Sequence, residues 1–267
     1  MTSLCIALMA AMLSCASVPD ISDSGLLWLV CRDSPLASDF EPQHLIEYQG
    51  VKLRSDAHKA FLEMLSAMDA DGISGLRLQS AYRPHSYQSA IFDQRVKELM
   101  QKGMAKEAAV YQASQSIQYP GASEHQTGLA LDVSVSGTLT QSFAETNAGQ
   151  WLDENSHNFG FIIRYPESKT DVTRIIYEPW HLRYVGNPHA SMMKKMDLTL
   201  EEYWSHMPEL KTYMVWEDDN DYYLVIYTDT LPDKMPSEAI DISSIGRIEN
   251  AQYIMTMKKT YPIIEIK

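Results

Sequence analysis

Two short stretches, well separated in the chain, contain residues that could bind a metal ion. The first reads Ser-Glu-His-Gln-Thr-Gly-Leu-Ala-Leu-Asp over residues 123–132, and the second reads Glu-Pro-Trp-His over residues 178–181. They supply the imidazoles of His125 and His181 and the carboxylate of Asp132. Three such ligands, with a fourth position open to water, are typical of a catalytic zinc site. The sequence therefore predicts that these three residues bind Zn²⁺.

A further carboxylate, Glu178, lies three residues before His181. Bound zinc lowers the pKa of water to about 7, so a neighbouring carboxylate is a strong enough base to take the proton. The same group can return that proton to a leaving amine. We expect Glu178 to be the general base of a hydrolytic site. A structural ion pair is the alternative role for this residue.

Upstream, residues 80–88 read Ser-Ala-Tyr-Arg-Pro-His-Ser-Tyr-Gln, with Arg83 directly before Pro84. The proline takes the chain off a strand and into the next helix, which would leave Arg83 projecting into a cleft. A guanidinium can bind a carboxylate through two hydrogen bonds or stabilise an oxyanion. A substrate with a free carboxylate is therefore implied. Pairing of Arg83 with an acidic residue of the scaffold is the alternative.

In this order, the three motifs resemble those of the zinc D-alanyl-D-alanine carboxypeptidases of the vancomycin-resistance (VanY-like) type. The wider family also holds zinc D,D-dipeptidases, L,D-carboxypeptidases and Hedgehog-like zinc domains. Three separate motifs in the right order make a chance match improbable, and the resemblance covers roughly residues 25–190. It implies that the zinc ligands are His125, Asp132 and His181 and that the general base is Glu178. It also implies contacts to the substrate or the transition state from Arg83, Gln88 and Ser123.

The resemblance implies hydrolysis of the terminal D-Ala-D-Ala bond of peptidoglycan stem peptides, with Zn²⁺ as cofactor and a stem peptide or its precursor as partner. Related specificities stay open: an L,D-carboxypeptidase, a D,D-dipeptidase or a peptidoglycan endopeptidase. The motifs do not choose among them, because loops outside the motifs form the pocket walls. From another class, a non-catalytic zinc-containing module that binds peptidoglycan also stays open. Chelator-sensitive hydrolysis would separate an enzyme from such a module.

The elements that must position these motifs are short and of mixed type. Apolar spacing predicts a helix over residues 55–70, and alternation predicts a strand over residues 76–81. The form of a capping box over residues 199–202 predicts the start of another helix. Further helices are predicted over 86–100, 106–115, 146–158 and 188–196, and further strands over 26–30, 129–135, 161–164 and 180–185. We expect an α+β fold in which an antiparallel sheet carries the zinc site and helices flank it.

Three parts are expected along the chain: a signal or anchor segment over residues 1–20, a catalytic domain over 21–207, and a small β-rich appendage over 208–267. The apolar run at 4–13, followed by small residues at 14–16, resembles a secretory signal without its basic start. It is too short to span a bilayer comfortably. We therefore favour a location outside the cytoplasm, secreted or anchored at the cell envelope, over a cytosolic one. Membrane attachment is expected only through the N-terminus.

The composition limits the kinds of binding partner that we expect for this chain. A chain of 267 residues with 45% hydrophobic content can bury one sizeable core. Its 22 Lys and Arg stand against 35 Asp and Glu, a formal net charge of -13, so we expect no nucleic-acid partner. The three cysteines, Cys5, Cys15 and Cys31, lack zinc-finger spacing. The predicted zinc site therefore does not depend on thiolates.

Overall fold

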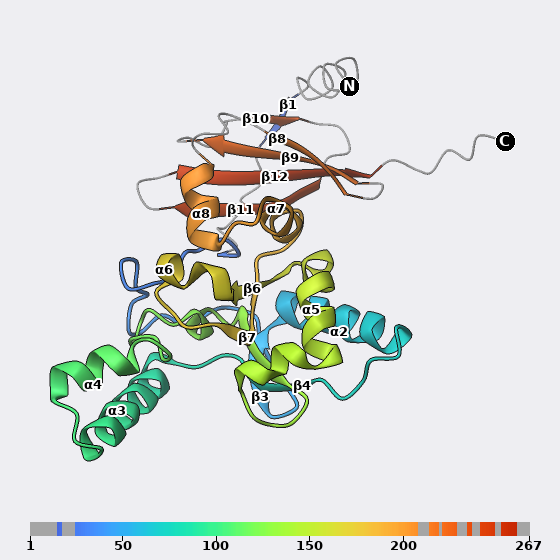
Figure 1. Cartoon of the computed structure of the whole chain (residues 1–267). Helices are drawn as coiled ribbons and strands as arrows, with labels where there is room; N and C mark the ends of the chain where they lie inside the picture. The colour runs from blue at the N-terminus through green and yellow to red at the C-terminus, as the bar shows by residue number, and fades with distance from the viewer. Residues whose placement is uncertain are drawn as a thin grey trace. The chain divides into compact units, whose positions relative to one another are not determined.

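The computed structural model describes residues 15–17, 25–207, 214–218, 221–228, 234–236, 241–248 and 252–260. Its contacts divide the chain into two compact units (Figure 1): one spans Leu29–Glu202, and the other draws on Met1–Trp28 and Tyr203–Lys267. The apolar run at 4–13 lies outside the described residues. The domain bounds drawn from the sequence remain a prediction. No described helix combines the length and apolar character needed to span a membrane.

A four-stranded antiparallel sheet forms the centre of the Leu29–Glu202 unit. Its spatial order is β4 (Arg77–Ser80), β5 (Ala130–Ser134), β7 (Glu178–Tyr184) and β6 (Phe161–Tyr165). The two middle strands carry most of the buried positions, and every residue of β5 is buried. Asp132 lies on the first of these strands, and the Glu-Pro-Trp-His motif of residues 178–181 lies on the second.

Figure 1 shows the helices of the chain and the strands of this sheet. A hairpin of β2 (Leu45–Tyr48) and β3 (Val51–Arg54) leads into α2 (Ser55–Ala70). Helices α3 (His85–Gln101) and α4 (Lys106–Ala113) enclose an apolar cluster centred on Phe92. The other helices are α5 (Asn147–Asn155), α6 (Thr170–Thr173), α7 (His189–Met196) and α8 (Leu200–His206). The 3-10 turns are η1 (Glu124–Thr127), η2 (Gln141–Glu145), η3 (Ser156–Phe159) and η4 (Glu167–Lys169).

The second unit contains its own antiparallel sheet. Its spatial order is β11 (Asp241–Ile248), β12 (Gln252–Thr260), β9 (Asp221–Thr228) and β8 (Met214–Asp218). A separate pair joins β1 (Cys15–Ser17) to β10 (Lys234–Pro236). Tyr223, Val225 and Ile254 are buried in this unit, as the alternation of aromatic and β-branched residues suggests. The predicted α+β class, with a β-rich C-terminal part, is confirmed.

The capping box is also confirmed at the start of α8. The backbone N–H of Thr199 donates to Oε2 of Glu202 at 2.9 Å, and the backbone N–H of Glu202 donates to Oγ1 of Thr199 at 3.2 Å. Such caps stabilise a helix start by about 1 kcal/mol. The cap matters for the site because the same first turn of α8 contains Glu201, which pairs with a buried arginine described below.

One predicted strand, over residues 26–30, is wrong. Leu27 and Val30 are buried as predicted. However, the backbone N–H of Trp28 donates to the carbonyl of Gly25 at 3.2 Å, so the chain turns here and does not pair as a strand. A short apolar run indicates burial but does not by itself fix the backbone conformation.

Gly160 joins the start of β6 to the end of β7. It ends η3 in the left-handed region, with φ of 79°. Its carbonyl accepts hydrogen bonds from the backbone N–H groups of Val185 at 2.9 Å and Gly186 at 3.1 Å. A Cβ at this position would lie 2.7 Å from Cε2 of Tyr184 and 3.0 Å from Cα of Gly186. Both the conformation and the close packing therefore require glycine here.

We predict that Gly160→Ala destabilises the fold by about 2–5 kcal/mol. The left-handed conformation contributes about 1–2 kcal/mol and the forced contacts about 1–3 kcal/mol. Gly137→Ala is the matched control, because Gly137 has φ of 83° but an added Cβ there would meet no atom within 4 Å. Equilibrium urea unfolding of the two variants measures the difference. Equal destabilisation would show that the packing around Gly160 relaxes at no cost.

Candidate metal centre

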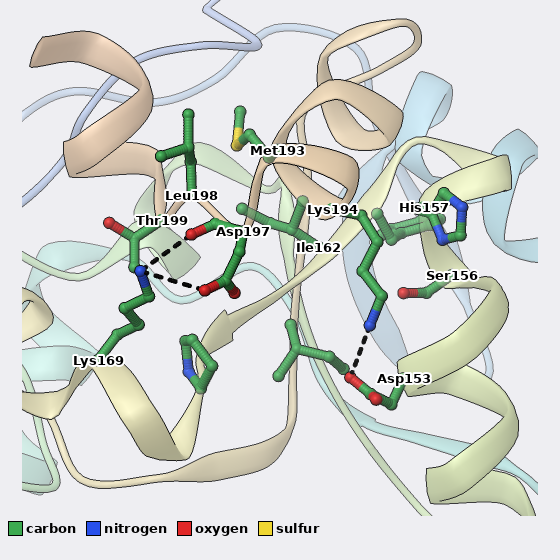
Figure 2. Close-up of a pocket in the computed structure, with 13 residues that line it drawn as sticks. Asp153, Ser156, His157, Ile162, Lys169, Met193, Lys194, Asp197, Leu198 and Thr199 are labelled. Carbon is green, nitrogen blue, oxygen red and sulfur yellow. Dashed lines mark hydrogen bonds and ion pairs between the residues drawn. The ribbon is translucent and has the colours of Figure 1, made fainter. Parts of the chain in front are cut away.

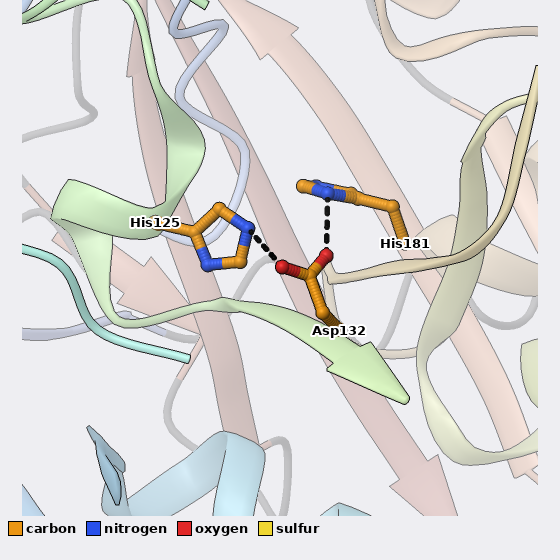
Figure 3. Close-up of side chains that lie close together, drawn as sticks. All are labelled: His125, Asp132 and His181. Carbon is orange, nitrogen blue, oxygen red and sulfur yellow. Dashed lines mark ion pairs between the residues drawn. The ribbon is translucent and has the colours of Figure 1, made fainter. Parts of the chain in front are cut away.

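The pairing of the two middle strands brings two predicted ligands together. Asp132 of β5 lies directly opposite His181 of β7 in the antiparallel register. Opposed residues of this kind share one face of the sheet, with Cβ atoms about 4.5–5.5 Å apart. Here Nδ1 of His181 lies 3.2 Å from Oδ1 of Asp132 (Figure 3).

The third predicted ligand comes from a single 3-10 turn. His125 lies in η1, which ends at Gly128 with φ of 72°. A Cβ on Gly128 would lie 3.0 Å from Cδ2 of Leu45 and 3.3 Å from the backbone nitrogen of Arg54, so glycine is needed for this turn to pack. The turn directs Nε2 of His125 to within 3.2 Å of Oδ2 of Asp132 (Figure 3).

The three side chains form a compact, buried donor set. Ligand atoms of His125, Asp132 and His181 all lie within 4.8 Å of one another. Nε2 of His125 and Oδ1 of Asp132 are buried and have no hydrogen-bond partner within the described residues. A bound cation would satisfy both atoms. Two imidazole nitrogens and one carboxylate oxygen suit Zn²⁺, whose borderline softness favours such a mixed set.

The protonation of the donor set also suits a metal. Nδ1 of His125 lies 2.6 Å from the backbone carbonyl of Ala81, to which it donates, so Nε2 carries the lone pair. Burial, together with the Arg83 guanidinium, lowers the pKa of His125 to about 4, which leaves the ring neutral at pH 7. Burial alone would raise the pKa of Asp132, but the two imidazoles hold it well below its usual range. Neutral imidazole and ionised carboxylate are the forms that bind metals.

Glu178 lies beside this set without being part of it. It is the first residue of β7, and its Oε2 lies 3.7 Å from Nδ1 of His181. Burial and then the charge of Asp132 raise the pKa of Glu178 well above its usual value, while Arg83 opposes the shift. A buried carboxyl group with a raised pKa next to a ligand set is suited to accept and return a proton.

Arg83 faces the same cluster from beyond the end of β4. Its backbone N–H donates to the carbonyl of His125 at 3.1 Å. Its Nη2 lies 3.6 Å from Oδ2 of Asp132, and its buried Nε has no hydrogen-bond partner among the described residues. Part of the guanidinium is therefore directed at the cluster with hydrogen-bonding capacity to spare.

The remaining two predicted contacts are more enclosed. Gln88 is 1% exposed, and its Nε2 donates to the backbone carbonyl of Gln118 at 2.7 Å, while its buried Oε1 has no described partner. Ser123 is buried directly before η1, and its side chain does not cap that turn. Gln88 thus braces the loop at Gln118. Substrate contact by Gln88 or Ser123 remains a prediction.

A cluster of four charged side chains next to the metal centre, three of them buried, was not predicted from the sequence. Glu124, next to His125, accepts from Nε of Arg164 at 2.8 Å and lies 2.9 Å from Nη1 of Arg183, both at Oε1. Arg164 in turn binds both oxygens of Glu201, at 2.7 and 2.8 Å. Burial alone would raise the pKa of Glu124, but the two guanidiniums lower it, so it is ionised. We name Glu124, Arg164, Arg183 and Glu201 the charge cluster.

A signal for this cluster is present in the strands. Arg164 stands in Phe-Ile-Ile-Arg-Tyr and Arg183 in His-Leu-Arg-Tyr-Val, and both lie on strands otherwise rich in apolar or aromatic residues. An arginine in such a strand needs a buried acidic partner. Tyr165, the neighbour of Arg164, packs its ring centroid 4.9 Å from that of His181 and so forms one wall of the metal centre.

A cavity of about 110 Å³ lies elsewhere in the same unit, beside β6 and α7 (Figure 2). Its charged side chains are already paired: Lys194 with Asp153 at 3.1 Å, and Lys169 with the carbonyl of Asp197 at 2.9 Å. None of the predicted site residues lines it. The site chemistry therefore belongs to the sheet face around Asp132 and not to this cavity.

Parts of this chain are similar in sequence to known proteins. The putative carboxypeptidase YodJ of Bacillus subtilis is 37% identical over 198 residues, which cover 69% of this chain and 69% of that protein. A D-alanyl-D-alanine carboxypeptidase of Enterococcus faecium is 36% identical over 177 residues, or 66% of this chain and 52% of that protein. The chain thus spans about two thirds of the first relative and about half of the second.

Solved structures with similar folds include a mutant of the vancomycin-resistance D,D-pentapeptidase VanY in complex with Zn(II). It is 36% identical, with a TM-score of 0.61, covering 68% of this chain and 99% of that one. VanYB in complex with D-alanine-D-alanine matches with 36% identity and a TM-score of 0.61, over 67% and 97% of the two chains. The L,D-carboxypeptidase LdcB matches with 34% identity and a TM-score of 0.60, over 72% and 93%.

A family model described as "VanY: D-alanyl-D-alanine carboxypeptidase" matches residues 50–187, which contain all three motifs and every predicted site residue. The match to this family model covers more than half of the chain, and it agrees with the similar folds and the related sequences described above. The chain belongs to the VanY family of D-alanyl-D-alanine carboxypeptidases.

Proposed function

We propose that this protein is a zinc-dependent carboxypeptidase that hydrolyses the terminal D-Ala-D-Ala bond of peptidoglycan stem peptides. The observation that carries the proposal is the convergence of His125, Asp132 and His181 on one buried point, with ligand atoms within 4.8 Å. Glu178 and Arg83 stand beside this point from two further directions. The three ligands, the carboxylate of Glu178 and the guanidinium of Arg83 together make up the parts of a metallopeptidase site.

The chain's own residues account for the steps around the reacting bond. When bound, Zn²⁺ polarises the scissile carbonyl and lowers the pKa of water. Glu178 takes a proton from the attacking water and passes it to the departing amine, so that the C–N bond breaks after the new C–O bond has formed. Arg83 stabilises the negative charge that develops on the carbonyl oxygen. Tyr165 is buried and packs against the ring of His181.

The family and the structural relatives support the D,D-specific activity over the alternatives. The relatives of this chain include a D-alanyl-D-alanine carboxypeptidase, and a similar structure holds D-alanine-D-alanine. The intact pair of Glu178 and Arg83 argues against a non-catalytic binding module. LdcB, an L,D-carboxypeptidase, is a comparably similar structure, so the matching tetrapeptide is the natural competing substrate in a test.

The substrate also bears on location. Stem peptides that are already part of the cell wall lie outside the cytoplasm, so hydrolysis of these peptides supports a location there. Residues 1–20 would serve as the signal or anchor segment that the apolar run suggests. If the full chain is exported, removal of residues 1–20 would indicate a cleaved signal, and their retention would indicate an anchor.

We predict that purified protein releases one D-alanine from a pentapeptide ending in D-Ala-D-Ala, and that a chelator abolishes the release while added Zn²⁺ restores it. Mass spectrometry of the products with the pentapeptide and the matching tetrapeptide measures both reactions. Loss of alanine only from the tetrapeptide would replace D,D- with L,D-specificity. Folded, zinc-loaded protein that cleaves neither peptide would refute the carboxypeptidase function.

We predict that Glu178→Gln lowers kcat by about 10²–10⁴-fold, the usual contribution of a general base. Zinc content should stay at the wild-type level, because Glu178 lies outside the ligand set. Glu154→Gln, which changes an exposed glutamate on α5, is the matched control and should keep full activity. Kinetics and metal analysis of both variants provide the test. Wild-type kcat in the Glu178→Gln variant would rule out this base.

We predict that Arg83→Lys lowers kcat/KM by about 10–100-fold, because lysine keeps the charge but loses the forked hydrogen-bonding geometry. The zinc affinity should change little, since the contact of Arg83 to Asp132 is long, at 3.6 Å. Steady-state kinetics with the pentapeptide, together with zinc titration, separates the two effects. An unchanged kcat/KM would instead assign Arg83 to the scaffold.

A further inference from the structure

Two complementary atoms face each other beneath the metal centre without making a hydrogen bond. Nε2 of His181 lies 3.9 Å from Oε2 of Glu124. Both atoms are buried, and neither has a hydrogen-bond partner within the described residues. A nitrogen and a carboxylate oxygen in this arrangement need a displacement of about 1 Å to reach hydrogen-bonding distance. Each is therefore the available partner of the other.

The orientation of His181 makes this pairing chemically significant. Its Nδ1 is the nitrogen that faces Asp132, at 3.2 Å. To bind a metal, Nδ1 must present a lone pair, so a neutral ring must carry its proton on Nε2. That N–H points to the buried side of the site, where an acceptor is required. His125 meets the same requirement through the backbone carbonyl of Ala81.

Glu124 is held so that one oxygen remains for this purpose. Its Oε1 receives Arg164 at 2.8 Å and faces Arg183 at 2.9 Å. These contacts occupy Oε1 and leave Oε2 directed at His181. Arg164 contacts the two carboxylates through different nitrogens: its Nε donates to Glu124, and its Nη1 and Nη2 donate to Glu201.

We propose that Glu124 is a positioning residue for the zinc site: it accepts the Nε2 proton of His181, fixes the tautomer and orientation of that ring, and is itself held by Arg164 and Arg183. The inference deepens the proposed function, since it rests on His181 being a ligand. Partners of this kind outside the ligand set typically contribute about 10–100-fold to metal affinity or activity.

Glu124→Gln tests the proposal. The amide oxygen of glutamine would turn to the two arginines, which are donors only, and its NH₂ would then face His181. A donor at that point favours a proton on Nδ1 of His181, which removes the ligand lone pair. We expect the zinc dissociation constant of the metal-free protein, measured by competition with a chromophoric chelator, to rise about 10–100-fold. The visible spectrum of the Co²⁺-substituted protein should shift as well.

Glu201→Gln is the matched control. It also removes one carboxylate from Arg164, but the glutamine keeps an acceptor oxygen for that arginine, and the side-chain contacts of Glu201 are to Arg164. Its zinc dissociation constant should stay within about threefold of wild type and its Co²⁺ spectrum should be unchanged, even if its melting temperature falls. Equal weakening of zinc binding in both variants, or wild-type binding in the Glu124→Gln variant, would overturn the proposal.

Two further measurements are the zinc affinity of the Glu124→Asp variant and the zinc stoichiometry of the wild-type protein. If Glu124→Gln does not fold, Glu124→Asp keeps the charge for the arginines but draws the carboxylate back from His181. Its zinc affinity should then fall between the wild-type value and the value expected for Glu124→Gln, and wild-type affinity would overturn the proposal. Absence of stoichiometric zinc binding by the wild-type protein would instead refute the proposed metal site, which distinguishes the two failures.

Discussion

The metal centre depends on the register between β5 and β7. Asp132 and His181 share a face of the sheet only because they are directly opposed, and a slip of one residue would turn one of them to the other face. The neighbouring pair, Leu131 and Leu182, is opposed in the same register and fully buried. The apolar residues that fill the core on one face of these strands therefore also fix the position of the ligands on the other.

The charge cluster is the second constraint, and burying its charges has an electrostatic cost. Taking Glu124, Arg164 and Arg183 out of water is costly, and their mutual attraction offsets this only because the geometry is close. Removing one partner of such a cluster typically costs about 3–5 kcal/mol, because an uncompensated charge stays buried. An apolar core of the same volume could be at least as stable. A role beside the metal centre gives a physical reason for burying charge at this place.

The sequence indicated which residues could form the donor set, because His125 and Asp132 lie within one short segment and Glu178 and His181 within another, and because these segments resemble the motifs of a known family. The structure adds how the two segments meet, through the pairing of β5 with β7. The charge cluster joins Glu124 to Arg164 and Arg164 to Glu201, from separate segments that only the folded sheet and α8 bring together. The strand predicted over residues 26–30 was wrong for a similar reason. An apolar run predicts burial, but it does not determine whether the backbone pairs with another strand.

The two imidazole rings differ in the group that orients them. This difference determines which substitutions can alter the position of each ring. His125 is oriented by the carbonyl of Ala81, a backbone group that no side-chain substitution removes. His181 faces a side chain, Glu124, whose position depends in turn on two arginines. Substitutions of Glu124, or of the two arginines that contact it, can therefore alter the position of His181, while the position of His125 follows the backbone. If a substitution outside the ligand set changes the metal affinity, we therefore expect it to affect Glu124 or the arginines that contact it.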